Sequence, residues 1–405
     1  MKLHLPRIFG KKAPHTRIHL DFASTTPVRE EILKEMQPYF NEVWANPSAI
    51  YKEGAIARGV IDTAREELAR TLRVRAHDVT FTSGGTESNN LALIGYVEAL
   101  HETGKAYGDM EIISSRLEHP SILETLIYLE KRGVRVAHVS VDEEGLIHAR
   151  EVESLLNPST VLVTFAYANS EIGVVQDVKK ITRAIRAYNE LHKVKIMTHI
   201  DASQAPLWLS CALDMLGVDM MTLDAGKCYG PKGVGVLAHR HWVPLSPYLH
   251  GGGQERGLRS GTENTALVVG CVRAIVLAQA TFEKRSVDVL VLQSYFFIEL
   301  TKHFPQCVIN GSVKNRIANN INISIPGLDT EYATIWLDSK GVSVSTRSAC
   351  GAVGSTGSSV VREISHDEAR ATSTLRFTLG EGTTQNEVDT AIAKLKECVN
   401  VMSRG

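Results

Sequence analysis

The stretch L-D-A-G-K-C-Y-G-P-K-G-V-G, residues 223–235, places a single lysine, Lys227, among small residues. An apolar run at 220–223 precedes it, and a second apolar run at 234–237 follows a Gly/Pro turn. A lysine at the end of a short strand is well placed to form an imine with a carbonyl cofactor, because the glycine and alanine before it let a flat ring approach the backbone. The alternative is a surface turn with a solvated lysine, and the stretch alone is compatible with both.

Short apolar runs alternate with amphipathic stretches on either side of Lys227. Strands are predicted at 78–82, 112–114, 134–139, 161–166, 195–200, 220–223 and 234–237, and helices at 54–72, 89–100, 121–131 and 178–192. This alternation predicts an α/β fold with a mostly parallel sheet covered on both faces. Ligands bind outside the carboxyl ends of the strands in such sheets. The residues of interest that follow these strands are Gly85, Thr86, His119, Asn169, Ser170, Asp201 and Lys227.

The chain divides into four predicted segments. Residues 1–18 form a basic lead that we expect to be disordered, and residues 19–30, with a short strand at 19–22, are expected to pack with the small domain. Residues 31–265 form the large, cofactor-binding domain. Residues 266–405 form a smaller α+β domain with strands at 321–325 and 375–378 and a mobile loop around Cys350, where glycine and serine dominate residues 351–359.

Composition narrows the classes of partner. The 405 residues carry 44 Lys+Arg against 45 Asp+Glu, so no strong field favours nucleic acid, and no uninterrupted apolar run approaches a membrane span. Residues 1–18 contain no acid and no apolar core, which excludes a secretory signal but leaves an organellar targeting peptide as an alternative to a disordered lead. The six cysteines show neither C-x-x-C spacing nor metal-ligand spacing with histidine. We therefore expect no metal site, no disulfide framework and a reducing, cytoplasmic compartment.

Three motifs could serve a phosphorylated ring cofactor. S-G-G-T at 83–86 follows a strand and opens a helix, so its free N–H groups could bind a phosphate, although many strand–helix turns carry glycine. Asp201 could pair with a protonated ring nitrogen or could be a helix N-cap. His119 could stack on the ring or could be structural.

Two further residues could handle a substrate. Cys350 lies in a polar, flexible context, S-T-R-S-A-C-G-A-V-G-S, and nearby Arg347 would favour its thiolate. It is a candidate nucleophile that could swing into a site, or else a bystander thiol. Arg376 lies within an apolar strand, where a guanidinium usually has an anionic partner such as a substrate carboxylate.

Taken in order, these motifs resemble those of the cysteine desulfurases, in the class V aminotransferase group, which have the type I fold of pyridoxal-phosphate enzymes. The resemblance covers the chain from Leu20 to about Val399. The matching motifs are L-D-F-A-S-T-T-P, N-P-S, F-T-S-G-G-T-E-S-N-N-L-A, E-H, N-S-E-I-G-V-V-Q-D, H-I-D-A-S-Q, K-C-Y-G-P-K-G-V-G, H-G-G-G-Q-E-R-G-L-R-S-G-T, S-A-C and L-R-F-T-L-G.

The resemblance implies roles for individual residues. Lys227 would hold pyridoxal 5'-phosphate as an internal aldimine and later remove the Cα proton, while Asp201 keeps the pyridine nitrogen protonated. His119 would stack on the ring and relay protons. The cofactor's phosphate and phenolic oxygen would be bound by Gly85, Thr86, Gln204 and Ser170, together with Thr262 from the partner subunit of a homodimer. The substrate carboxylate would be held by Arg376, with help from Asn46.

The implied reaction converts L-cysteine to L-alanine and leaves a persulfide on Cys350 for transfer to a sulfur-acceptor protein. Two alternatives remain open: a selenocysteine lyase or other β-eliminating lyase, and a non-catalytic binding partner. Iron–sulfur cluster assembly is the implied pathway, although the chain ends at Gly405 without the C-terminal extension that some members use to dock an iron–sulfur scaffold.

The sequence departs from the family just before the lysine. The family usually has Ser-Gly-His there, with two phosphate donors, whereas this chain has Asp224, Ala225 and Gly226. A carboxylate about 4 Å from a phosphate would cost on the order of a few kcal/mol. Either Asp224 points away, or the phosphate is held differently, or cofactor affinity is reduced. Ser170 is also a departure, since the family usually has a longer Asn that contacts the phenolic oxygen.

Overall fold

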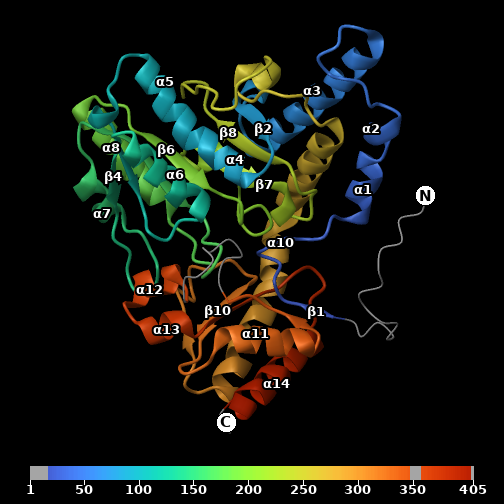
Figure 1. The fold of residues 1–405 in the computed structure, drawn as a ribbon, viewed down its shortest axis with the longest axis vertical. Helices are drawn as coiled ribbons and strands as arrows, with labels where there is room; N and C mark the ends of the chain where they lie inside the picture. The colour runs from blue at the N-terminus through green and yellow to red at the C-terminus, as the bar shows by residue number, and fades with distance from the viewer. Residues whose placement is uncertain (1–16, 347–356, 403–405) are drawn as a thin grey trace.

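Within the residues that the computed structural model describes, 17–346 and 357–402, the central feature is a seven-stranded sheet (Figure 1). Its strands, in spatial order, are β2 (Val79–Thr82), β8 (Gly235–His239), β7 (Met220–Asp224), β6 (Met197–Asp201), β5 (Thr160–Ala166), β3 (Glu111–Ser114) and β4 (Arg135–His138). Strand β8 is antiparallel to β2 and β7, and the other neighbours are parallel. The predicted α/β fold with a mostly parallel sheet is confirmed.

Helices cover both faces of this sheet. One face packs against α1 (Glu30–Met36), α3 (Lys52–Leu72), α7 (Ala149–Leu155), α8 (Val178–His192) and the first part of α10 (Thr265–His303). The other packs against α6 (Pro120–Lys131) and the continuous helical run of α4 (Gly85–Asn90), a π-helical turn (Leu91–Gly95) and α5 (Tyr96–Glu102). Successive strand side chains alternate between the two cores: Met220 packs with the second group and Met221 with the first. That alternation is the period of a β-strand, and it explains why these strands are apolar throughout.

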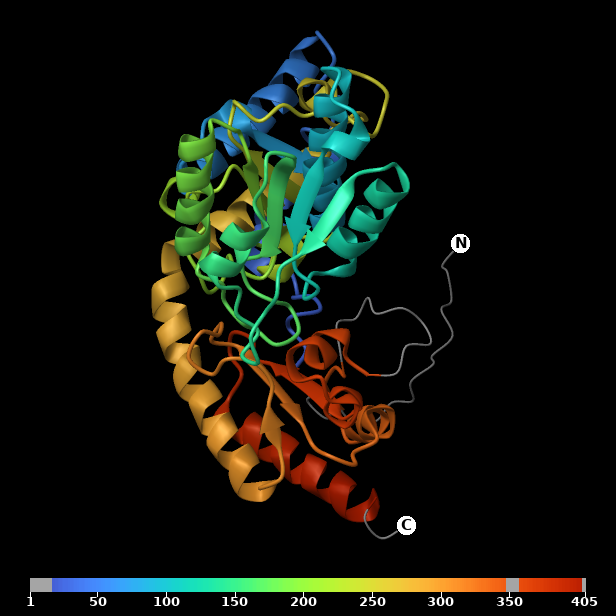
Figure 2. The ribbon, with the colours of Figure 1, turned by 90° about the vertical axis from the view of Figure 1, so that its left-hand side faces the viewer.

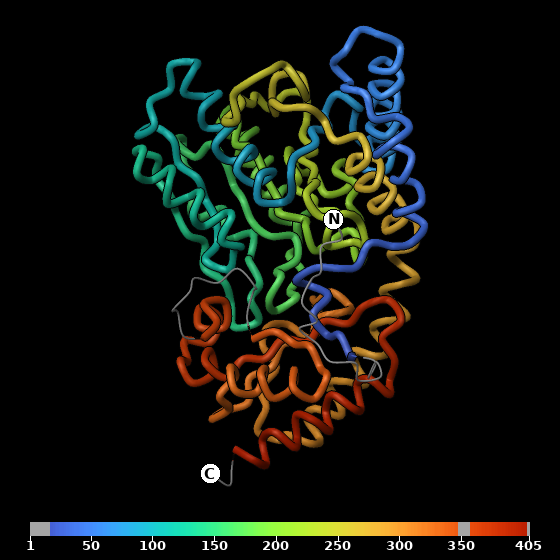
Figure 3. Tube along the Cα trace, turned by 45° about the vertical axis from the view of Figure 1, so that its right-hand side comes forward, coloured from blue at the N-terminus to red at the C-terminus, as the bar shows by residue number. Residues whose placement is uncertain are grey.

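A smaller lobe lies below the large sheet in the view of Figure 1. Its antiparallel sheet has the order β12 (Thr374–Thr378), β10 (Asn320–Ser324), β9 (Val308–Ile309). Around it lie α11 (Thr330–Ser339), α12 (Ser359–Ser365), α13 (Glu368–Thr372) and α14 (Gln385–Met402). Strand β1 (Ile18–His19) pairs in parallel with β11 (Val342–Ser343), and the chain then crosses to the large lobe (Figure 3). The N-terminal segment therefore contacts both lobes.

Helix α10 starts in the large lobe, runs down along the small lobe and joins the two (Figure 2). It begins at an N-cap in which Asn264 accepts a hydrogen bond from the N–H of Leu267, and it packs along α3, α1 and α14. By length and composition α10 is apolar enough to cross a membrane, although Arg273 and Gln279 interrupt its apolar residues. Half of its most apolar window is buried inside the protein. The boundary placed at residue 265 stays a prediction.

The structure corrects several predicted boundaries. The N-terminal strand expected at 19–22 is only Ile18–His19, and Asp21 forms an isolated bridge with Thr378. The helix expected from residue 89 begins at Gly85, so the S-G-G-T turn directly adjoins its N-terminus. Short helices α2 (Pro38–Asn41), α7, α9 (Leu213–Leu216) and α11–α13 were not predicted. The expected loop 351–359 lies mostly outside the described residues, and its last residue begins α12.

Candidate active site

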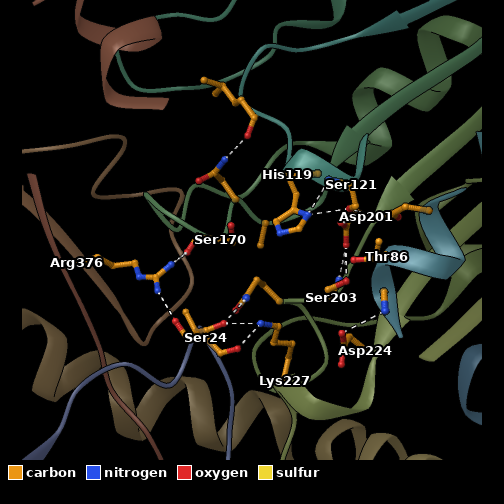
Figure 4. A pocket seen from close by; sticks show the side chains of 18 residues that line it. Ser24, Thr86, His119, Ser121, Ser170, Asp201, Ser203, Asp224, Lys227 and Arg376 are labelled. Atoms are coloured by element: carbon orange, nitrogen blue, oxygen red, sulfur yellow. Dashed lines mark hydrogen bonds between the residues drawn. The ribbon is translucent and has the colours of Figure 1, made fainter. Parts of the chain in front are cut away.

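A pocket of about 230 Å³ opens at the carboxyl ends of β5, β6 and β7 (Figure 4). This is the edge where ligands bind in parallel sheets. The loop after β3, the start of α4, the N-terminal segment and β12 also contribute to its wall. The site residues predicted from the sequence that line it are Gly85, Thr86, His119, Ser170, Asp201, Gln204, Lys227 and Arg376.

Lys227 lies at the end of the single 3₁₀ turn that follows β7. Its Nζ donates to two carbonyl oxygens of the N-terminal segment, that of Ala23 at 3.1 Å and that of Ser24 at 2.5 Å. Gln204 Nε2 also donates to the Ala23 oxygen, at 3.0 Å. The segment that begins in the small lobe therefore positions the lysine of the large lobe.

Asp201 ends β6, and hydrogen bonds fix both of its carboxylate oxygens. Oδ1 accepts from the N–H of Ser203 at 2.9 Å and from its hydroxyl at 2.6 Å. Oδ2 accepts from Asn89 Nδ2 at 2.8 Å. The residue closes a turn rather than capping a helix, so the N-cap alternative is not realised. Its carboxylate is held in one orientation at the pocket wall.

His119 caps the start of α6 and faces the pocket (Figure 4). Its Nδ1 accepts from the N–H of Ser121 at 3.1 Å and lies 2.8 Å from the Ser121 hydroxyl. Because a backbone N–H can only donate, the neutral ring carries its proton on Nε2. Burial lowers the pKa of His119, and Asp201 partly opposes that shift. The ring is therefore neutral near pH 7.

Asp224 does not point away from the phosphate end of the pocket. Its Oδ2 accepts from the N–H of Gly85, the first residue of α4, at 3.2 Å. Its Oδ1 accepts from the N–H of Gly226 at 2.8 Å. The N–H of Ser83 is also taken, since it donates to Glu87 Oε2 at 2.7 Å. Two N–H groups of the expected phosphate cradle thus already bind carboxylates of this chain.

Arg376, on β12, is buried at the other end of the pocket. Its guanidinium donates to Asp21 Oδ1 at 2.7 Å, to the Ser24 hydroxyl at 2.9 Å and to the Ser170 carbonyl at 2.9 Å. Its anionic partner in this structure is therefore Asp21. Ser170 contributes its backbone carbonyl to this network.

Two of the predicted residues are described but do not line this pocket, and a third lies outside the described residues. Asn46 is exposed on the loop before α3, where its Oδ1 accepts from the N–H of Ser48 at 2.9 Å. Thr262 is exposed and does not line the pocket of its own chain. Cys350, with Arg347, lies outside the described residues.

Several polar residues that position the site were not predicted from the sequence. Asn89 Nδ2 donates to both Asp201 Oδ2 and the Ser121 hydroxyl, each at 2.8 Å, and so links Asp201 to His119. Ser203 and Asp21 play comparable parts beside Asp201 and Arg376. Asn89 and Asp21 lie inside matched motifs, but only the folded chain shows that Asn89 contacts Asp201 and Ser121 and that Asp21 contacts Arg376.

The residues fit pyridoxal phosphate at one end of the pocket only. Lys227, Asp201, His119 and Gln204 surround a space suited to its ring. At the phosphate end the donor N–H of Gly85 is occupied by a carboxylate, and Gly226 supplies no side chain. Across residues 17–346 and 357–402, no group of three or more His, Cys, Asp or Glu side chains is placed to hold a metal ion.

Comparisons with known proteins agree on one family. The family model described as Aminotransferase class-V matches residues 18–390. Cysteine desulfurase IscS of Dictyoglomus turgidum is 36% identical over 382 residues, 94% of each chain. Cysteine desulfurase IscS 1 of Archaeoglobus fulgidus is 35% identical over 373 residues, covering 92% of this chain and 94% of that protein. Among solved structures, a NifS-like protein superposes with a TM-score of 0.87 at 32% identity, covering 95% of this chain and 100% of the other. SspA in complex with cysteine gives a TM-score of 0.75 at 33% identity, covering 90% and 99%.

Proposed function

The chain belongs to the aminotransferase class-V family, among its cysteine desulfurases, and on this premise we propose that it converts L-cysteine to L-alanine and collects the sulfur as a persulfide on Cys350. The observation that carries the proposal is the convergence of Lys227, His119 and Asp201 in one pocket at the carboxyl edge of the sheet. Arg376 lies at the other end of that pocket, where an amino-acid carboxylate would be recognised.

Proteins of this family depend on pyridoxal phosphate, which supplies an electron sink for the substrate carbon that loses its proton. Lys227 and Asp201 are the side chains that would hold it at the ring end. Lys227 Nζ is the basic group placed to take the Cα proton of L-cysteine. His119 holds a proton on Nε2 at the pocket surface and is placed to donate it.

The sulfur step needs a nucleophile from the chain itself. The Cys350 thiolate attacks the substrate sulfur, so that an S–S bond forms as the Cβ–S bond breaks and its electron pair stays on the substrate carbons. Cβ then takes up a proton and Cα regains the one it lost, which gives alanine. Arg376 would bind the substrate carboxylate while this happens, which requires it to share its guanidinium with Asp21.

A desulfurase assay with L-cysteine, in which alanine and protein-bound persulfide are both quantified, tests the proposal. We expect both products from the parent chain assayed with added pyridoxal phosphate, and we expect Cys350→Ala to abolish persulfide and sulfide release without changing the Kd for the cofactor. Cys307→Ala, at a partly exposed cysteine, is the matched control and should behave like the parent. Undiminished turnover in Cys350→Ala would instead indicate direct β-elimination, and no alanine from the parent would contradict the proposal.

We also propose that the chain acts as a homodimer in which Thr262 reaches the partner's pocket. Two observations support this: Thr262 is exposed and absent from its own pocket, and one stretch exposes several large apolar side chains. These are Leu33, Phe40, Trp44, Ile50, Tyr51 and Ile56. Several large apolar side chains exposed within one stretch are typical of protein–protein interfaces. A sulfur-acceptor protein is proposed as the partner that receives the persulfide sulfur, without identifying that protein.

A reducing, cytoplasmic compartment is proposed on the state of the thiols. Cys211, Cys228, Cys271, Cys307 and Cys398, the cysteines within the described ranges, are free, and four of them are buried. Such thiols persist where disulfides are not favoured. Fractionation of cells that produce the chain would test this, and recovery in a secreted fraction would contradict it.

A further inference from the structure

The departure at Asp224 has a definite geometry in the folded chain. The residue ends β7, and its carboxylate bridges two N–H groups from separate elements, that of Gly85 at the start of α4 and that of Gly226 in the turn before Lys227. Gly85 and Asp224 line the pocket that holds Lys227, and Gly226 lies in the turn directly before that lysine. An N–H at a helix start is where a phosphate group would be bound, because the donors there lack partners within the helix.

We propose that the Asp224 carboxylate occupies the subsite for the cofactor's phosphate, so that this chain binds pyridoxal phosphate weakly and reversibly and gains no affinity from the phosphate over pyridoxal. The inference deepens the proposed function and rests on it, since it requires a carbonyl cofactor at Lys227. Binding of the cofactor then requires its phosphate to displace the Asp224 carboxylate from the N–H of Gly85.

Two physical reasons favour the internal carboxylate over a phosphate. Asp224 is tethered beside the N–H of Gly85, so its binding costs none of the translational freedom that a separate molecule loses. A phosphate that displaced it would remain next to a like charge, and such repulsion is strong at the reduced dielectric of a partly buried site.

Gly226 and Gly85 both help to hold this arrangement. A Cβ added at Gly226 would lie 3.2 Å from Asp224 Oδ1, and one added at Gly85 would lie 3.3 Å from Oδ2 and 3.0 Å from the Ser203 hydroxyl. A side chain at either position would crowd the carboxylate. The D-A-G sequence therefore acts as a unit: the glycine leaves the room that the aspartate uses.

The experiment compares two carbonyl compounds on the full chain after removal of any bound cofactor. Pyridoxal phosphate and pyridoxal are titrated separately against the parent, Asp224→Asn and Asp224→Ser. The visible absorption of the bound compound gives each Kd. Borohydride reduction followed by peptide mass spectrometry reports whether the compound is attached to Lys227. Asp214→Asn, at an exposed aspartate on α9, controls for net charge.

We expect the parent and Asp214→Asn to bind the two compounds with Kd values within about threefold of each other. In Asp224→Asn and Asp224→Ser, we expect the Kd for pyridoxal phosphate to fall at least about tenfold, or ~1.4 kcal/mol, while the Kd for pyridoxal changes less than about threefold.

Other outcomes overturn the proposal in distinguishable ways. If both Kd values change together, or if the variants only melt at a lower temperature, Asp224 has a structural role and the inference fails while the proposed function stands. The same holds if the parent already prefers pyridoxal phosphate by more than about tenfold. If neither compound can be trapped on Lys227 in any variant, both the inference and the proposed function fail.

Discussion

Asn89 is a residue whose importance depends on two contacts that it makes at once. It lies on α4 and donates to Asp201 and to Ser121, which in turn supports His119. Neither partner is near it in sequence, and an asparagine in S-N-N has many possible roles. The side chain acts as a positioning residue, because it touches the groups that face the pocket and does not itself have to contact substrate.

We expect Asn89→Ala to lower kcat for L-cysteine about tenfold and to leave KM within about twofold, because misplaced reacting groups slow the chemical step more than binding. Steady-state kinetics measures this. Asn90→Ala is the matched control: Asn90 is the next residue on α4, bonds to the Thr86 carbonyl and to Thr125, and should leave kcat near the parent value. Equal effects from the two variants would show that Asn89 has no special role.

Glu118, next to His119, makes the free energy of unfolding depend on pH. Burial raises the pKa of its carboxyl to about 8, and its hydrogen bond with Ser115 only partly offsets this effect. A carboxyl whose pKa is higher in the folded state holds its proton more tightly there. Stability contributed by this group is therefore present at low pH and is lost as pH rises from about 4.5 through about 8.

Urea unfolding between pH 6 and pH 8 should show this loss. We expect the parent to lose up to ~1 kcal/mol per pH unit relative to Glu118→Gln, which cannot ionise. Glu124→Gln, at an exposed position on the same α6, should follow the parent. Parallel curves for the parent and Glu118→Gln would rule out the raised pKa.

At the scale of elements, the glycine-rich loop 250–262 is fixed by a buried ion pair. Glu255 forms two bonds to Arg65 of α3, at 2.7 and 2.8 Å, and accepts from the N–H of Phe81 on β2 at 2.9 Å. Glu255 and Arg256 both have positive φ, at 46° and 58°, a conformation that costs energy for residues with a side chain. The buried pair holds the loop in this shape, and so fixes the segment that leads to Thr262.

Removing one partner should be costly, because the other charge would stay buried without its counter-ion. We expect Arg65→Met to lower the free energy of unfolding by about 3–5 kcal/mol, measured by urea denaturation. Arg70→Met, which removes an exposed pair with Glu66 on the same α3, should change it by less than about 1 kcal/mol. Similar losses from the two variants would mean that the buried pair is not what secures the loop.

At the scale of the whole molecule, several large apolar side chains between α1 and the start of α3 are exposed. The helices α1, α2 and α3 lie together at one side of the large lobe (Figure 1). Trp44 stands out, with 73% of its surface exposed. We propose that a second copy of the chain covers this surface, as the proposed role of Thr262 in the partner's pocket requires. Association would then complete the site as well as bury apolar area.

Sedimentation velocity at micromolar concentration should find the parent as a dimer. Trp44→Glu should shift it toward monomer, because a charge would be buried in the interface. Ile335→Glu replaces an equally exposed apolar residue on α11, away from this stretch, and should leave the dimer intact. A monomeric parent, or a Trp44→Glu variant that stays fully dimeric, would contradict the proposal.

Much of this protein follows from its sequence alone. Apolar runs of strand length alternate with amphipathic helices, and that rhythm predicts a parallel sheet and the edge at which Lys227, Asp201 and His119 meet. The motifs in order were enough to predict the family. These features depend on local sequence or on the order of motifs along the chain, so they can be predicted from the sequence.

Only the tertiary structure decided how these residues are held and which of them meet. It directs the Asp224 carboxylate to the N–H of Gly85 at the phosphate end of the pocket, and it pairs Arg376 with Asp21. It also links His119 to Asp201 through Asn89. It also kept Asn46 and Thr262 out of this chain's pocket. The physical reason is that a side chain's direction and partners depend on how separate elements pack. A match to a motif at one residue gives neither the direction nor the partners. The sequence D-A-G-K predicts the lysine. It does not show that the nearby aspartate accepts a hydrogen bond from the first N–H of α4, where a cofactor's phosphate is expected.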